Sequence, residues 1–175
     1  MRKLIGVTIA LLFASSPSFA SIEVGMSYVT PLDGLSEEAG GGTSLYLSYE
    51  MPYGASDMSL IASLGAVGYG GLEVQLYGVP LVEYQWYSFP VNVGGRLYAD
   101  TSEEKTGPFF EILGGCLLKM ATIKVGGSDS SETKFSWNIS PAVGGNFTEH
   151  FSAKMSYNRG ADGWNWFGTH IAYTF

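Results

Sequence analysis

Apolar and polar residues alternate along most of the chain with a period of two residues, whereas no stretch repeats every 3.6 residues as an amphipathic helix does. The alternation is most regular at the end of the sequence, where one face consists of Phe167, Thr169, Ile171, Tyr173 and Phe175. Seven earlier segments show the same pattern: 22–30, 43–51, 58–68, 84–98, 109–120, 135–145 and 148–157. Alternation of this kind is typical of β-strands with one apolar face, so the sequence predicts eight strands.

The connections between the predicted strands alternate between short and long. Short turns are predicted at 54–57 and 144–146, and longer polar loops are predicted at 31–42, 125–132 and 158–163. An even number of strands of about nine to eleven residues, with short turns at one end and long loops at the other, is typical of a β-barrel that spans a membrane. We therefore predict an all-β fold, an eight-stranded antiparallel up-and-down transmembrane β-barrel, with both termini on the short-turn side.

Two connections fit this scheme less well. The segment 100–107 is longer than a tight turn, and the segment 68–83 is too apolar for an ordinary loop. We expect residues 68–83 to extend the third and fourth predicted strands beyond the membrane as a paired ribbon.

A soluble β-sandwich is the alternative fold, and composition argues against it. In a sandwich the polar strand faces would meet water. Here only 14% of residues are charged and 46% are hydrophobic, whereas a soluble surface is about 25–35% charged. Aromatic residues gather near the strand ends on the apolar faces, as in the girdles at a membrane interface: Tyr28, Tyr49, Phe89, Phe135, Tyr157, Phe167 and Phe175. Because backbone groups in lipid must all be paired, such a sheet has to close on itself.

The N-terminus has the order of a secretory signal peptide. Arg2 and Lys3 precede an apolar run at 4–14, and Ser18 and Ala20 are the small residues expected before a cleavage site. The run is too short for a membrane anchor, which needs about 18 or more apolar residues. We therefore predict a cleaved signal peptide at 1–20 and a barrel domain at 21–175.

Charge and cysteine content exclude several classes of function. The first 20 residues hold two of the nine Lys/Arg, so the remainder has seven against sixteen Asp/Glu, a formal charge of −9. This acidity disfavours nucleic-acid binding. Cys116 is the only cysteine, and with two histidines it gives no metal-site spacing, so neither a disulfide nor a metal or other cofactor is expected.

A small number of charged residues fall on the predicted inward faces: Glu23, Glu50, Arg96, Glu111, Lys119, His150 and Lys154. Buried charges are costly unless they are paired. We therefore predict an ionic cluster inside the barrel lumen, near the rim on the side of the termini, that is formed by Glu50, Arg96, Glu111 and Lys154. Two interpretations remain open: a structural plug of a narrow barrel, or a gate whose re-pairing opens a small pore.

The last residues, GTHIAYTF, resemble the C-terminal signal of bacterial outer-membrane barrels, in which the barrel-assembly machinery reads the final strand. The matching positions are Phe167, Ile171, Tyr173 and Phe175. The whole pattern resembles the small OmpA/OmpX-type barrels and the related opacity-type adhesins. This resemblance implies a place in the cell outer membrane, among outer-membrane lipid and lipopolysaccharide. It also implies a structural or adhesin-like role, with a host or surface partner bound through the extracellular loops.

An enzymatic function has one candidate motif. His150 and Ser152 resemble the His-x-Ser of the outer-membrane lipid A deacylases, which use a Ser-His-Glu triad. No Glu follows Ser152, and Glu149 is predicted on the opposite face, so no catalytic residue is assigned and lipid A modification is a remote alternative. We expect His170 to be a satisfied lumen residue, and Trp164 and Trp166 to be interfacial anchors rather than a partner-binding patch.

Overall fold

The computed structural model describes residues 20–32, 39–53, 57–71, 73–76, 79–99, 106–125 and 128–175. The predicted signal peptide lies outside the described residues apart from Ala20, as do parts of the predicted segments 31–42, 54–57, 68–83, 100–107 and 125–132. The elements are β1 (Ser21–Leu32), β2 (Gly40–Pro52), β3 (Met58–Gly70), β4 (Glu73–Leu76), β5 (Val79–Tyr98), β6 (Gly107–Val125), β7 (Ser128–Asn146), β8 (Phe151–Gly160), η1 (Ala161–Gly163) and β9 (Asn165–Thr174). Within this part of the chain, no helix is long and apolar enough to cross a membrane.

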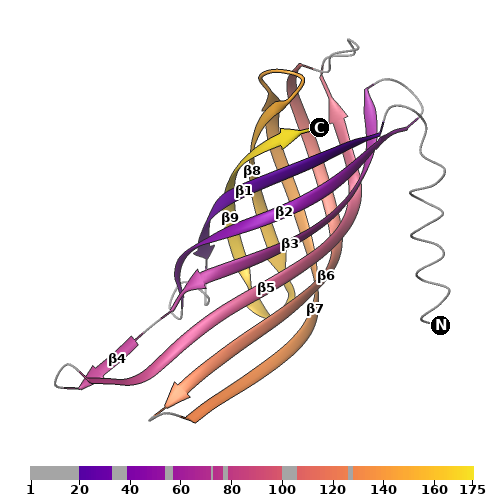
Figure 1. Cartoon of the computed structure of the whole chain (residues 1–175). Helices are drawn as coiled ribbons and strands as arrows, with labels where there is room; N and C mark the ends of the chain where they lie inside the picture. Colours follow the sequence, from indigo (N-terminus) through magenta and orange to yellow (C-terminus); the bar gives the residue numbers. More distant parts are fainter. Residues whose placement is uncertain are drawn as a thin grey trace.

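Eight of the strands form a closed antiparallel barrel, which confirms the predicted fold (Figure 1). Each strand pairs with its neighbour in the chain, β9 returns to β1, and pairing of β3 with β5 closes the ring. The short strand β4 lies outside the ring and pairs with the first part of β5. This hairpin is the ribbon that the sequence predicted within 68–83.

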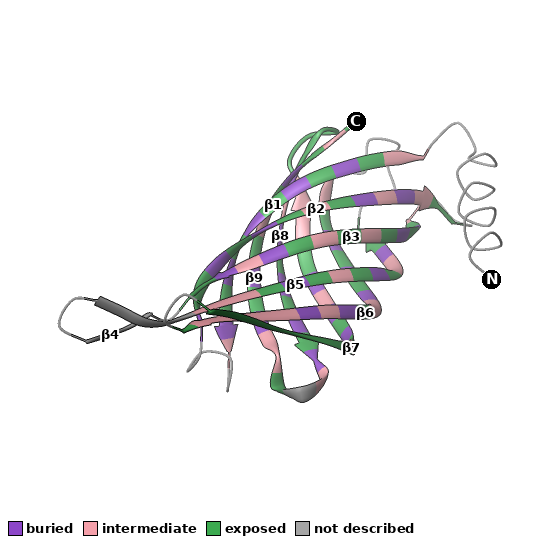
Figure 2. Ribbon diagram, turned by 60° about the horizontal axis from the view of Figure 1, so that its bottom comes forward, coloured by how far each residue is buried: buried purple, intermediate pink, exposed green. Residues whose placement is uncertain are grey.

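Side-chain burial alternates along the parts of the strands that form the barrel wall, and it is inverted relative to a soluble protein (Figure 2). The projecting start of β7 is exposed on both faces. The outward positions carry large apolar side chains that are open to the surroundings, such as Val93 with 65% exposure, whereas the inward Ser88 is fully buried. A soluble sandwich would bury the apolar face instead. The sandwich alternative is therefore wrong, and the apolar outer surface suits a lipid environment.

The ends of the barrel differ in length. β1 begins and β9 ends at what we call the terminal end, and β5, β6 and β7 project far beyond the ring at the opposite end, the ribbon end (Figure 1). These three strands have 20, 19 and 19 residues, longer than predicted. The predicted loop 125–132 is wrong, because Ser128–Glu132 belong to β7 and pair with Val125–Ala121 of β6. Thr and Ile residues on the facing strand favour such pairing, although the segment itself is polar.

One short turn at the terminal end also differs from its prediction. β7 continues through the predicted turn 144–146, and the turn comprises Phe147–His150. The Thr148 hydroxyl accepts hydrogen bonds from the backbone N–H groups of His150 at 3.2 Å and Phe151 at 3.0 Å. Hydroxyl side chains stabilise turns in this way, so β8 begins only at Phe151. At the other end, 40–42 and 158–160 are strand residues rather than loop.

Candidate functional site

Strand periodicity brings the predicted charges to one level of the lumen. Glu23 lies near the start of β1 and Glu50 near the end of β2, while Arg96 of β5 stands directly opposite Glu111 of β6 in the sheet register. Lys154 lies near the start of β8. All five are inward-facing and buried at the terminal end of the barrel.

The structure places Glu50, Arg96, Glu111 and Lys154 in direct contact. The Arg96 guanidinium donates to Glu111, with Nη2 at 2.6 Å and Nε at 2.9 Å from the same carboxylate oxygen. Its Nη1 lies 3.0 Å from Glu50 Oε2. The Lys154 ammonium lies 2.7 Å from the other oxygen of Glu111. Glu111 therefore bridges the two cations.

Three further side chains complete this site. Glu23 lies 3.3 Å from Arg96 and 3.9 Å from Lys154. The Tyr98 hydroxyl donates to Glu50 at 2.7 Å, and the Phe109 ring packs against Arg96, 4.3 Å from centroid to guanidinium carbon. Tyr98 comes two residues after Arg96 on β5, so its side chain points to the same, inward side of the barrel. The alternation in the sequence could therefore have identified Tyr98 as a residue of this site. We use "ionic cluster" below for Glu23, Glu50, Arg96, Glu111 and Lys154.

The ionic cluster pairs its buried charges with one another across the lumen. Arg96 donates to three carboxylates at once, and charge-assisted bonds of this kind compensate for the cost of taking the ions out of water. The side chains belong to five different strands, so they tie opposite walls of the barrel together. Nothing in the cluster is a nucleophile beside a general base, which acyl-transfer chemistry would need.

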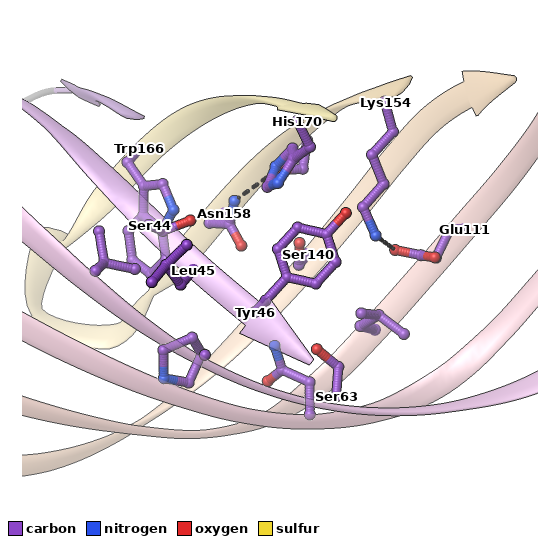
Figure 3. A pocket seen from close by; sticks show the side chains of 16 residues that line it. Ser44, Leu45, Tyr46, Ser63, Glu111, Ser140, Lys154, Asn158, Trp166 and His170 are labelled. Atoms are coloured by element: carbon purple, nitrogen blue, oxygen red, sulfur yellow. Dashed lines mark hydrogen bonds and ion pairs between the residues drawn. The ribbon is translucent and has the colours of Figure 1, made fainter. Parts of the chain in front are cut away.

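A small polar chamber lies next to the ionic cluster on the side of the ribbon end (Figure 3). Its volume is about 50 Å³. His170 Nε2 and Ser156 Oγ are 2.7 Å apart, Asn158 donates to Ser156 at 2.8 Å, and the Tyr46 ring meets His170 edge-on at 5.5 Å. Since a cavity needs only about 10–15 Å³ of this kind to hold a water, the chamber is large enough to hold water.

His170 is only half satisfied. It lies in the lumen and bonds to Ser156 through Nε2, whereas its buried Nδ1 has no protein hydrogen-bond partner among the described residues. A water in the chamber is the natural partner, because buried polar atoms rarely stay unpaired. In the part of the chain that the structure describes, no group of three or more His, Cys, Asp or Glu side chains is placed to hold a metal ion.

His150 does not face the lumen, in contrast to its prediction. It lies in the turn before β8, exposed, with Nδ1 3.0 Å from the backbone oxygen of Thr174 and its ring stacked on Tyr173. Glu149 is 3.4 Å from His150 Nε2 rather than on an opposite face. Ser152, in contrast, is buried in the lumen and donates to Glu23 at 3.5 Å. His150 and Ser152 thus lie on different sides of the barrel wall and cannot form a catalytic pair.

A close approach at Gly25 gives a first testable prediction. The Tyr46 ring on β2 lies over Gly25, its register partner on β1, and a Cβ at this position would overlap the ring. Gly25→Ala is expected to lower the free energy of unfolding in urea by about 1–3 kcal/mol, as overpacking does. Gly95→Ala is the matched control, because a Cβ there would meet only Ser59 O at 3.6 Å. Equal losses in the two variants would contradict this account of the lumen packing.

Comparison with known proteins gives structural matches but no sequence matches. No protein-family model matches the chain, and no curated protein matches it. The crystal structure of Ail, the attachment invasion locus protein of Yersinia pestis, matches with a TM-score of 0.67 and 17% identity over 89% of this chain and 97% of Ail. The N-terminal β-barrel domain of Pseudomonas aeruginosa OprF matches with a TM-score of 0.55 and 16% identity over 89% of this chain and 97% of that domain. Together with the closed ring and the apolar outer face, these matches show that the chain has the fold of the small eight-stranded outer-membrane β-barrels.

Proposed function

We propose that the protein is an exported outer-membrane β-barrel that acts at the cell surface through its ribbon end. The predicted signal peptide would deliver the chain to the periplasm, and the apolar outer face would contact outer-membrane lipid and lipopolysaccharide. The terminal end, where β1 begins and β9 ends, would face the periplasm. The ribbon end would then stand outside the membrane, where a surface partner can reach it.

One observation carries this proposal: β7 has an open edge outside the barrel. β8 pairs with β7 only from Asn138 onward, so Ser128–Trp137 pair with β6 on one side and, among the described residues, with no strand on the other. An exposed edge presents unpaired N–H and C=O groups. Such an edge binds extended polypeptide segments by adding a strand to the sheet. We call Ser128–Trp137 the open edge.

The charge of the chain indicates the kind of partner. One matched structure, with a TM-score of 0.63, is described as Ail in complex with the heparin analogue sucrose octasulfate. A polyanion of that kind suits the present chain poorly, because the predicted mature form has a formal charge of −9. The open edge carries Asp129, Glu132 and Lys134. An extended polypeptide with basic residues, on a host protein or another cell surface, is the better match.

Shortening the hairpin formed by β6 and β7 tests the surface role. Thr122 and Ser131 are register partners, so replacing 122–131 by Asn-Gly would connect the adjacent pair Ala121 and Glu132 through a two-residue turn. The barrel is expected to fold normally, as judged by heat-dependent gel mobility. Adherence of producing cells to cultured host cells and immobilised matrix proteins is expected to be lost.

The control for this test keeps the edge backbone and removes its acidic charges. Asp129→Asn with Glu132→Gln is expected to retain part of the adherence, because strand addition relies on main-chain hydrogen bonds. If the shortened variant adheres as well as the wild type, the β6–β7 hairpin is not the binding surface. The remaining function would then be structural.

A narrow gated pore is the second candidate function. Lys154 lies 2.7 Å from Glu111 but also 3.9 Å from Glu23, so its ammonium has a second carboxylate to which it can move. Re-pairing within the ionic cluster would open the lumen at the terminal end. We do not propose lipid A modification, because His150 and Ser152 are separated by the barrel wall.

A further inference from the structure

We propose that the lumen contains a second, independent barrier at the ribbon end, so that the ionic cluster alone cannot gate a pore. This barrier, the apolar seal, consists of Val29, Val67, Tyr69, Trp86, Leu117, Trp164 and Trp166. The proposal does not depend on the surface role of the open edge. It concerns the path through the barrel, which the ionic cluster blocks only at the terminal end.

The apolar seal is a packed layer inside an otherwise polar lumen. Val29, Leu117 and Trp166 occupy inward positions of β1, β6 and β9 and are almost completely buried. The aromatic rings meet edge to face, with centroids 5.3 Å apart for Trp86 and Trp164 and 6.3 Å apart for Tyr69 and Trp166. Such edge-to-face pairs are favourable beyond their area burial. Trp164 and Trp166 are therefore not interfacial anchors, which corrects the expectation from sequence.

A cation fastens the seal to the barrel wall. Trp164 follows η1 in the connection between β8 and β9. The Lys119 ammonium, from β6, lies 4.9 Å from the centroid of the Trp164 ring and donates to the backbone oxygen of Ala161 at 3.3 Å. The backbone N–H of Gly160 donates to Trp164 O at 3.0 Å. The sequence predicted that Lys119 faces the lumen but assigned it no partner. In the structure it holds the connection between β8 and β9 across the lumen.

An apolar layer blocks ions by a mechanism different from that of a salt bridge. Hydrophobic constrictions exclude ions because water does not fill them, and the interior of a conducting barrel is polar. The chamber of about 50 Å³ beside the ionic cluster includes Trp166 among its lining residues, so this chamber lies between the two barriers. Barriers in series each stop conduction. Opening the ionic cluster would therefore connect the chamber to the terminal end only.

Single-channel recording of the refolded mature protein, residues 21–175, in a planar bilayer tests this proposal. Lys154→Gln weakens the ionic cluster, and Trp164→Ala with Trp166→Ser removes the centre of the apolar seal. The wild type, the Lys154→Gln variant and the seal variant are all expected to be silent. The combination of all three substitutions is expected to give discrete openings. Heat-dependent gel mobility establishes that each variant is folded before recording.

The control replaces a tryptophan whose side chain lies outside the lumen. Trp137 is exposed on β7, so Trp137→Ala combined with Lys154→Gln should remain silent. If the combined seal variant does not fold, Lys119→Gln with Lys154→Gln tests the same barrier by releasing Trp164. Openings from Lys154→Gln alone, openings from the seal variant alone, or silence of the folded combined variants would each overturn the proposal.

Discussion

Glu111→Ala is expected to lower the free energy of unfolding by about 3–5 kcal/mol, the cost of leaving a buried ion without its partner. The carboxylate of Glu111 is bonded to Arg96 at 2.6 Å and to Lys154 at 2.7 Å, and all three side chains are buried. Without this carboxylate, Arg96 and Lys154 have Glu23 and Glu50 as their remaining partners. Lys154 then loses its short contact, because Glu23 lies as far as 3.9 Å from its ammonium. Urea titration in lipid vesicles, with the folded fraction read from gel mobility, measures the loss.

An exposed ion pair on the same protein provides the control. Lys134 and Glu132 lie 3.0 Å apart, as close as Arg96 and Glu50, but their side chains are 62% and 66% exposed. Pairs of this kind contribute about 0–1 kcal/mol, so Glu132→Ala should change the free energy of unfolding little. If Glu111→Ala costs no more than Glu132→Ala, the ionic cluster does not stabilise the barrel, and its residues would have to be retained for another reason.

The sequence predicted the closed barrel because burial depends on the parity of each position. A shift of one residue exchanges the two faces of a strand. An alternating segment can therefore join the sheet only with its apolar face on one side and its polar face on the other. The same parity identified Arg96 and Glu111 as inward-facing, and the cost of an unpaired buried charge indicated that they would find partners. Their direct register could not be predicted, since it depends on how far each neighbouring strand is shifted around the ring.

The incorrect predictions arose where another interaction outweighed the alternation. At His150 the Thr148 hydroxyl caps a turn and delays the start of β8. At 125–132 the composition is typical of a loop, but pairing with β6 extends the strand. Trp166 lies on the inward parity of β9, so the alternation itself could have placed it in the lumen. Its aromatic character favoured the membrane interface instead, which illustrates that parity is the stronger signal.

Phe175→Ala is expected to reduce sharply the amount of protein inserted in the outer membrane of cells, while the purified variant still refolds into detergent. We propose that the alternating residues Phe167, Ile171, Tyr173 and Phe175 form the signal that the barrel-assembly machinery recognises. In the folded barrel, Phe175 contributes a backbone hydrogen bond to Ile22 O at 2.9 Å and an edge-to-face contact with Tyr173 at 4.9 Å. The ring contact is worth about 0.5–1.5 kcal/mol, and the substitution keeps the backbone bond.

A second phenylalanine at the same end separates recognition from stability. Phe147, in the turn before β8, is 74% exposed, and Phe175 is 73% exposed, so both substitutions remove a similar apolar surface. Phe147→Ala should insert normally in cells, because it lies outside the alternating pattern of the final strand. Comparable insertion defects in the two variants would assign the effect to lost aromatic surface at the membrane interface. A defect confined to Phe175→Ala, with unchanged refolding in vitro, requires a step that reads the last strand before the barrel has closed.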